Sequence, residues 1–267
     1  MPTTAPVRIA FLTSIRDIGA DDQVGQMVPT RDGSRYMEGV IERTTKESLP
    51  GGKLHGLVEV VSIITDDRLK DLVGSGYTSE PCGWAKWIFP LGLPSDERGN
   101  KATDLVVNIP SDFRSIPKCD ASLKREAKRA FEVKVLRIMK ETGATTIVSD
   151  HYMAKIVHLI GEFGLYSRVL NIHPAVTCLD SPFCVRGPTP TKDVLELAKK
   201  QPMRTGATLH VVNEKFDDGP IIKWAAPTPV YASDEPRALR WRNYQLAKLP
   251  VFVEGMQKYA TEMFPRL

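Results

Sequence analysis

The stretch Val169–Pro174, which reads VLNIHP, decides how this chain is interpreted. Its first two residues continue an apolar run that predicts a buried strand, and Pro174 has no backbone N–H with which to extend that strand. Asn171 and His173 are two positions apart, so a strand places both side chains on one face, at its carboxyl end. Ligands bind at that edge of open α/β sheets. The alternative is that the two residues only cap the strand and hydrogen-bond a loop.

Strand and helix patterns alternate along the rest of the chain. Compact apolar runs predict strands at residues 7–13, 57–65, 105–109, 145–149, 206–212 and 220–226. Amphipathic or helix-favouring patterns predict helices at residues 34–48, 122–142, 151–163, 191–200 and 234–263. This alternation predicts an α/β fold with a mostly parallel central sheet flanked by helices.

The composition is that of an ordinary globular protein, and it narrows the function. The 267 residues carry a net charge of only +4, and no aromatic-interleaved basic stripe occurs, so we expect no nucleic-acid partner. No run has the length of a membrane span and no signal-peptide pattern is found, so we expect a cytoplasmic protein without a membrane partner. The four cysteines form no CxxC pair, and we expect neither a metal site nor a disulfide framework.

Two other segments limit the possible sites. The turn after the first predicted strand, residues 14–26, contains neither GxGxxG nor GxxxxGKS/T, which argues against a nucleotide site there. Residues 66–117 show weak periodicity and many prolines and glycines. So long an irregular stretch either covers a site or packs on its own aromatic residues at the surface.

A second polar motif lies between the last two predicted strands. Residues 213–220 read NEKFDDGP, in which acidic residues precede a Gly-Pro turn of restricted geometry. Taken alone, such acids are usually solvated. Together with Asn171 and His173, they complete an amide, an imidazole and a carboxylate at one edge of the sheet.

In this order and at these separations, the motifs VLNIHP, SPFCVRGPTP and TGATLHVVNEKFDDGPII, with SDHYMAKI upstream, resemble the folate-dependent formyltransferases. That family includes glycinamide ribonucleotide and methionyl-tRNA formyltransferases. The similarity covers residues 145–229 well and the first strand loosely, whereas residues 14–117 match poorly. It implies a single Rossmann-like domain over residues 1–267, with core motifs at 145–230, a C-terminal helix at 234–263 and an enlarged N-terminal half.

The resemblance also implies roles for individual residues. The catalytic Asn, His and Asp of the family fall on Asn171, His173 and Asp217. Asp218 stands where the family usually has glycine, which leaves open which of the two acids acts. The co-substrate, 10-formyltetrahydrofolate, is expected between residues 153–156 and 212–217, contacted largely by backbone groups. The candidates for binding it are Met153, Ile156, Val212, Asn213, Phe216 and Asp217.

Formyl transfer needs a nitrogen nucleophile, hydrogen-bond donors for a developing oxyanion, and a proton relay. We expect Asn171 to hold the formyl oxygen, and His173, if it is protonated by its pairing with Asp217, to donate a second, charge-assisted hydrogen bond to it. Asp217 accepts the proton of the nucleophile. The competing chemistry is a nucleophilic Cys178 with His173, but no third residue is indicated to orient the imidazole. A non-enzymatic binding module would leave the polar trio unexplained.

Departures from the family narrow the acceptor. The chain lacks the glycine-rich phosphate cradle of the glycinamide ribonucleotide enzymes, and the part after residue 229 is short for the extra domain of the tRNA enzymes. The enlarged N-terminal half, with GQMVPTRDGSRYMEG at residues 25–39, resembles the hydroxyornithine formyltransferases of pyoverdine-type siderophore biosynthesis.

We therefore expect a small amine or hydroxylamine acceptor, foremost N-hydroxyornithine, and a monomer or homodimer. Arg35, Asp32 and Arg186 are candidates for binding the acceptor, and the sequence does not choose among them. The alternatives are another amine, either a purine ribonucleotide intermediate or an amino-sugar nucleotide, and hydrolysis of 10-formyltetrahydrofolate.

Overall fold

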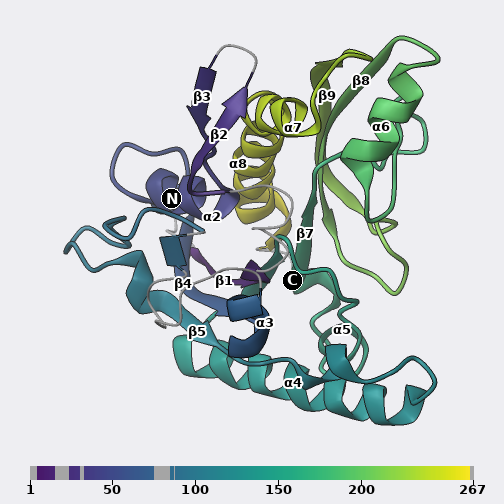
Figure 1. The fold of residues 1–267 in the computed structure, drawn as a ribbon. Helices are drawn as coiled ribbons and strands as arrows, with labels where there is room; N and C mark the ends of the chain where they lie inside the picture. Colours follow the sequence, from purple (N-terminus) through teal and green to yellow (C-terminus); the bar gives the residue numbers. More distant parts are fainter. Residues whose placement is uncertain (1–4, 16–23, 31–32, 75–84, 87, 265–267) are drawn as a thin grey trace.

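A seven-stranded sheet forms the centre of the protein, and five neighbouring strands of it run parallel (Figure 1). The computed structural model describes residues 5–15, 24–30, 33–74, 85–86 and 88–264. In spatial order the strands are β5 (Val106–Asn108), β4 (Val58–Thr65), β1 (Val7–Thr13), β6 (Thr146–Ser149), β7 (Val169–His173), β8 (Met203–Val211) and β9 (Ile221–Val230). Strand β8 runs antiparallel to both of its neighbours, β7 and β9. The predicted α/β fold with a mostly parallel sheet is confirmed, and each predicted strand has a counterpart.

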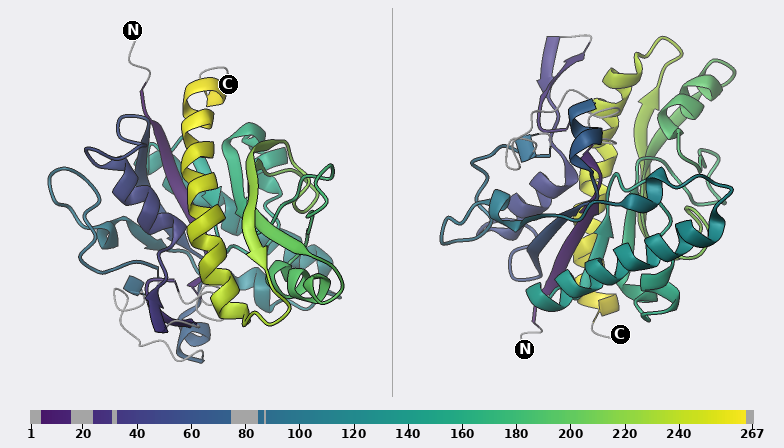
Figure 2. Two further views of the ribbon diagram at one scale, coloured as in Figure 1. Left: turned by 90° about the horizontal axis from the view of Figure 1, so that it is seen from above. Right: turned by 60° about the horizontal axis from the view of Figure 1, so that its bottom comes forward.

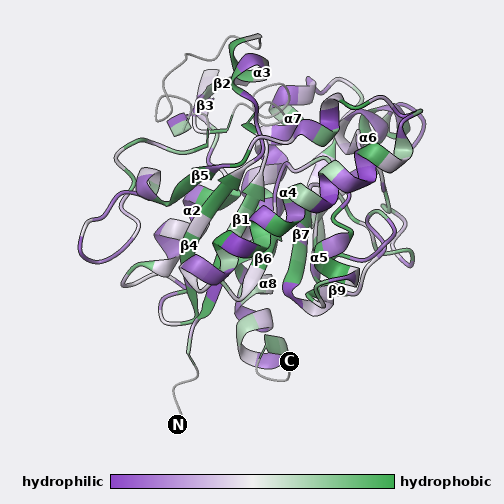
Figure 3. Ribbon diagram, turned by 90° about the horizontal axis from the view of Figure 1, so that it is seen from below, coloured by the Kyte–Doolittle hydropathy of each residue, from purple (hydrophilic) through white to green (hydrophobic). Residues whose placement is uncertain are grey.

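Helices cover both faces of the sheet (Figure 2). Successive residues of β1 point to opposite faces, so Phe11 packs in one core and Leu12 in the other. The Leu12 core is closed by α4 (Ala121–Thr142) and α5 (His158–Gly161), and the Phe11 core by α2 (Val40–Ser48) and the C-terminal helix. Hydrophilic and hydrophobic residues alternate along α4, whereas the strands beneath it are mainly hydrophobic (Figure 3).

The C-terminal helix is continuous but widens twice. It runs through α7 (Pro236–Asn243), a π turn at Tyr244–Lys248, α8 (Leu249–Lys258) and a second π turn at Tyr259–Met263. Pro250 lacks the N–H that a regular turn would use, and the first π turn immediately precedes it. That turn directs Tyr244 and Lys248 into the interior, where both are fully buried.

The helix predicted at residues 34–48 begins only at Val40. The segment Gly33–Tyr36 (β3) pairs instead with Met27–Thr30 (β2) in a separate two-stranded sheet, so this part of the prediction is wrong. Pairing with a partner strand outweighs the helical periodicity of so short a segment. The N-terminal half is thereby enlarged by a hairpin beside α7 (Figure 1).

The helix predicted at residues 151–163 is also largely wrong, because only α5 forms there. His151 has a φ of +59°, which no right-handed helix tolerates. The helix begins where the carboxylate of Glu132 accepts the backbone N–H groups of Val157 and Leu159. Residues 151–157 therefore form a loop that leaves the carboxyl end of β6.

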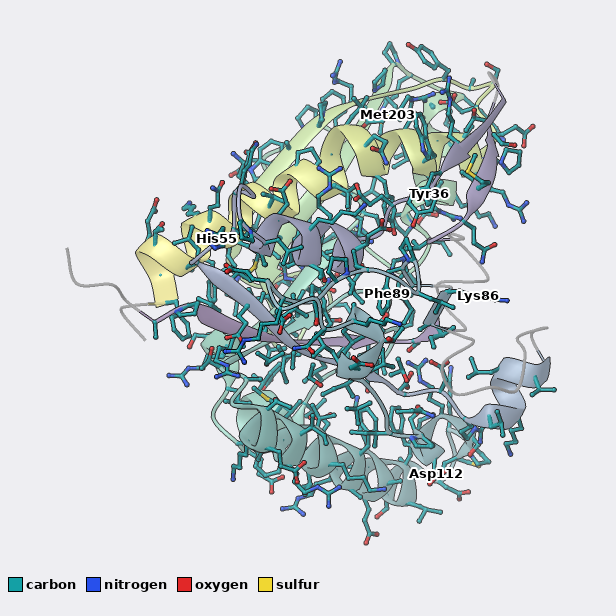
Figure 4. The ribbon with its side chains drawn as sticks, turned by 90° about the vertical axis from the view of Figure 1, so that its left-hand side faces the viewer. Tyr36, His55, Lys86, Phe89, Asp112 and Met203 are labelled. Atoms are coloured by element: carbon teal, nitrogen blue, oxygen red, sulfur yellow. The ribbon has the colours of Figure 1, made fainter. Side chains whose placement is uncertain are left out.

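The remaining helices are short. They are α3 (Leu69–Gly74), α6 (Pro190–Ala198) and 3₁₀ turns at Ala102–Leu105, Asp112–Ser115 and Tyr166–Arg168. Within the region 66–117, residues 75–84 and 87 lie outside the described part. Of the residues next to them, Phe89 is buried and Lys86 is exposed (Figure 4). The described part of this region thus contributes to the main core and is not only a surface excursion.

Candidate active site

Strand β7 carries Asn171 and His173 to the carboxyl edge of the sheet, as predicted from the VLNIHP stretch. It lies between β6, which runs parallel to it, and β8, which runs antiparallel. Asn171 is half-buried, whereas only 6% of His173 is exposed. Asn171 is paired in register with His210 of β8, a residue that the sequence did not single out.

The loop between β8 and β9 brings a carboxylate to the same place. Asp217 Oδ1 lies 3.4 Å from His173 Nδ1 and 3.8 Å from His210 Nε2. Asp217 has a φ of +53°, an unfavourable conformation for a residue other than glycine. Gly219 holds the loop against β8, because a Cβ there would lie 1.7 Å from the carbonyl oxygen of Val211. The predicted trio is therefore brought together, with His210 as a fourth member.

The hydrogen bonds of His210 fix the orientation of the Asn171 amide. His210 Nδ1 lies 3.0 Å from the carbonyl oxygen of Val211, which can only accept, so this nitrogen carries the proton. Nε2 is then an acceptor, and Asn171 Nδ2 donates to it at 3.1 Å. A flipped amide would place two acceptors against each other. The amide carries a second N–H with which Asn171 can donate to a ligand.

Both histidines of the site are neutral in the free protein near pH 7. Burial lowers the pKa of His173 to about 4, although the nearby Asp217 opposes this shift. Burial also lowers the pKa of His210. The condition of a protonated His173 is therefore not met in the free protein, because desolvation of the charged ring outweighs the attraction of Asp217. Nε2 of His173 is buried and has no hydrogen-bond partner among the residues that the structure describes.

The two adjacent acids of the loop have different partners. Asp218 Oδ1 is paired with Arg186 at 2.5 Å, whereas Asp217 Oδ1 approaches the two imidazoles. Geometry therefore favours Asp217 as the acid of the site. Among the residues suggested for acceptor binding, Arg186 is engaged in this pair, Arg35 lies exposed on β3, and Asp32 is outside the described residues.

The two segments expected to hold the folate lie side by side. Lys155 Nζ donates to the carbonyl oxygen of Glu214 at 3.2 Å and lies 5.0 Å from the centre of the Phe216 ring. The large apolar side chains of Met153, Val157 and Phe216 are exposed there, with 51%, 41% and 61% of their surface accessible. Exposed apolar groups on two facing loops are typical of a ligand site.

The other three candidates, Ile156, Val212 and Asn213, can offer a ligand only backbone or polar groups. Ile156 is 4% exposed and packs in the core beneath α4. The N–H of Val212 donates to the carbonyl oxygen of Val169 at 2.8 Å, which extends the β7–β8 pairing. Asn213 Oδ1 accepts the N–H of Lys215 and shapes the turn. These contacts agree with a site read largely by the backbone.

A second charged cluster, missed by the sequence analysis, lies at the end of β6. Lys248 Nζ donates to Asp150 Oδ1 and to the Tyr244 hydroxyl, both at 2.8 Å. His151 completes a ring, since its Nδ1 lies 3.1 Å from Asp150 Oδ2 and its Nε2 lies 2.8 Å from the Tyr244 hydroxyl. Periodicity could not reveal this cluster, because the π turn places its two helical members.

A protein-family model for formyl transferases matches residues 102–252, which is more than half of the chain. This chain belongs to the formyl transferase family. The predicted class of enzyme, a formyltransferase, is confirmed. The match spans β5 to α8 and includes all four polar residues of the site.

Individual relatives extend this assignment. PvdF of pyoverdin biosynthesis, described as a structurally unique N10-formyltetrahydrofolate-dependent formyltransferase, is 28% identical, with a TM-score of 0.81 over 95% of this chain and 99% of that one. Phosphoribosylglycinamide formyltransferase from Bacillus halodurans is 20% identical, with a TM-score of 0.56 over 96% of both chains, and supports the fold alone.

A formyltetrahydrofolate deformylase from Corynebacterium sp. (strain P-1) is 32% identical over 111 residues. These are 41% of this chain and 34% of the deformylase, so the match spans about a third of that relative. Within the described ranges, no helix is long and apolar enough to cross a membrane. No group of three His, Cys, Asp or Glu in that part of the formyltransferase is arranged to hold a metal ion.

Proposed function

We propose that this formyltransferase transfers the formyl group of 10-formyltetrahydrofolate to the hydroxylamine nitrogen of an N-hydroxyornithine acceptor. The observation that carries the proposal is the cluster of Asn171, His173 and Asp217 at the sheet edge, in which His210 orients the Asn171 amide and the buried Nε2 atom of His173 has no hydrogen-bond partner among the described residues. The similarity to PvdF, which spans 95% of this chain, supports the donor and the link to pyoverdin-type siderophore biosynthesis from which we infer the acceptor.

The residues at the site fit the donor. The exposed side chains of Met153 and Phe216 offer apolar surface to its flat rings, and the backbone of the facing loops offers hydrogen bonds. The donor supplies the formyl group and the nitrogen that leaves. Asn171 Nδ2, whose orientation is set by His210, donates its second N–H to the formyl oxygen and stabilises the charge that develops there.

The proton is moved by His173 and Asp217. As the acceptor nitrogen attacks the formyl carbon, the C=O electron pair moves to oxygen, and the proton of the nitrogen passes to the His173–Asp217 pair. Burial disfavours a charged imidazole in the free protein, but a neighbouring oxyanion favours it during the reaction. The charged imidazole then donates to the oxyanion. When the C=O bond re-forms and the C–N bond of the donor breaks, the pair returns the proton to the leaving nitrogen.

A hydroxylamine suits these residues better than an alkyl amine does. An alkyl amine has a pKa of about 10.4 and must first lose a proton near pH 7. The nitrogen of a hydroxylamine is much less basic, because of the adjacent oxygen, and is already neutral. A site whose imidazole is neutral and buried therefore needs to accept only the proton released during attack.

Hydrolysis of the donor is the second candidate, and the similarity to a deformylase favours it. The test is release of tetrahydrofolate from 10-formyltetrahydrofolate, followed by absorbance. The acceptor panel contains N-hydroxyornithine, ornithine, glycinamide ribonucleotide, an amino-sugar nucleotide and no acceptor. We expect turnover with N-hydroxyornithine only. Turnover without acceptor would establish a hydrolase, and no turnover combined with no folate binding would refute the function.

A further inference from the structure

The loop after β7 donates hydrogen bonds to both acidic residues of the β8–β9 loop, Asp217 and Asp218. Arg186 Nη1 donates to Asp218 Oδ1 at 2.5 Å, and the backbone N–H of Gly187 donates to Asp217 Oδ2 at 3.2 Å. Two consecutive residues of one loop thus hold two consecutive residues of the other. We call this arrangement, residues 186–187 with 217–218, the acid clamp.

The clamp is anchored to the sheet. Arg186 Nε and Nη2 both donate to the carbonyl oxygen of Thr177, at 3.0 and 2.8 Å. The N–H of Thr177 in turn donates to Oγ1 of Thr208, a buried residue of β8 that is paired in register with His173. The guanidinium therefore bridges a fixed point of the sheet edge and the acid loop, and its planar fork of donors matches this pattern of acceptors.

The clamp matters because Asp217 is held in an unfavourable conformation. A left-handed backbone at a residue other than glycine persists only when surrounding contacts impose it. One Oδ atom of Asp217 is used by the clamp, and the other faces His173 and His210. If the clamp opened, the loop could relax and carry the carboxylate away from both imidazoles.

We propose that Arg186 is a positioning residue that holds Asp217 against His173 by fixing Asp218, and that it does not bind the acceptor. The inference rests on the proposed function, since it concerns the group that moves the proton. A misplacement of a reacting group by about 1 Å can cost about 100-fold in rate. Because Asp217 acts as charge develops, the loss should fall on kcat, and KM for the acceptor should change little.

The test uses Arg186→Lys, which keeps the charge but loses the fork. We expect kcat to fall about 10- to 100-fold, and Asp218→Asn to lower it similarly. In an Asp217→Asn background, Arg186→Lys should add less than about 3-fold, because its effect passes through Asp217. The matched control is Arg242→Lys. Arg242 binds Asp234 and the carbonyl oxygen of Pro229 in the same way, but at the opposite end of the β8–β9 hairpin.

Two outcomes would overturn the inference. An equal loss in both backgrounds would show that Arg186 acts independently of Asp217. A raised KM for the acceptor with an unchanged kcat would assign Arg186 to acceptor binding, as the sequence analysis allowed. Comparison of unfolding midpoints with those of the Arg242→Lys control excludes a general loss of folding.

A measurement without substrates separates this inference from the proposed function. The chain contains only five histidines, so their imidazole signals can be assigned by NMR. In the free protein, Arg186→Lys should shift the titration of His173, which Asp217 influences, whereas Arg242→Lys should not. The titration of His210 does not serve here, because Arg186 also acts on it directly. If wild-type protein transfers no formyl group, the function fails while the titration of His173 still decides the clamp. An unchanged titration of His173 would refute the clamp.

Discussion

Lys248→Met should lower the free energy of unfolding by about 3–5 kcal/mol, because it leaves the buried Asp150 carboxylate without its ammonium partner. Only 1% of Lys248 and 3% of Asp150 are exposed, and their charged atoms are 2.8 Å apart. Methionine fills a similar volume without charge. The expected loss is therefore electrostatic, and packing of the π turn should change little.

The pKa of Asp150 gives an independent measure of how much its ion pairs contribute to the free energy of unfolding. Burial alone would raise it, but attraction from His151 and Lys248 outweighs burial and lowers the pKa from 3.8 to about 2. This difference corresponds to about 2 kcal/mol of stability at neutral pH. Because the folded protein binds this proton less readily than the unfolded chain, the contribution is complete above about pH 4 and is lost as the pH falls towards 2.

Urea unfolding followed by circular dichroism, from pH 7 down to pH 3, measures both effects. In Lys248→Met, the loss of stability on acidification should be smaller than in wild type, because the pKa of Asp150 in the folded protein rises towards its value in the unfolded chain. Adding Asp150→Asn to this variant should recover part of the stability, since no charge remains buried. The reasoning would be refuted if the free energy of unfolding of Lys248→Met lay within about 1 kcal/mol of wild type. It would also be refuted if the losses from Lys248→Met and Asp150→Asn were fully additive in the double variant.

Three further changes test the catalytic cluster. His210→Phe keeps a planar ring but removes the acceptor that orients the Asn171 amide, so the amide can flip. Random flipping alone would cost about 2-fold in rate, whereas complete loss of the donor costs about 100- to 1000-fold. We therefore expect steady-state kinetics to show kcat reduced about 10-fold. Equality with wild type would contradict this. The folded state disfavours protonated His173, so stability should rise with pH between about 4 and 6.5, and urea titrations of His173→Gln should lose this rise. Gly219→Ala places a Cβ 1.7 Å from a main-chain oxygen and should lower kcat by about 100-fold or more. Gly161→Ala, where the added Cβ meets open space, should leave kcat unchanged. Comparable rates for the two variants would show that the close approach at Gly219 does not position the loop.

The sequence predicted that Asn171 and His173 lie at the carboxyl edge of the sheet, because strand periodicity operates over a few neighbouring residues. The VLNIHP stretch placed Asn171 and His173 on one face of a strand, and β7 ends at His173 as expected from the following proline. The loop motif placed Asp217 nearby through the family resemblance. The choice between Asp217 and Asp218 needed the structure, since it depends on the position of Arg186 across another loop.

The residues that the sequence analysis missed depend on long-range pairing. His210 joins the site because β8 runs antiparallel to β7 and is paired in that register, which no local pattern specifies. A helix was expected from His151 onwards, but contacts with Asp150 and Tyr244 accompany a left-handed backbone there. The protonation state of His173, which the sequence left open, also needed the structure, because burial in the folded chain determines it.

The central claim is that Asn171 and His173 stabilise the charge that develops on the formyl oxygen. Single-turnover transfer from 10-formyltetrahydrofolate, with the acceptor that the panel identifies, tests it most directly. Asn171→Ala and His173→Ala should each slow transfer by about 100- to 1000-fold while donor binding stays within a few-fold of wild type. If either variant kept more than about a tenth of the wild-type rate, these residues would not be the oxyanion donors.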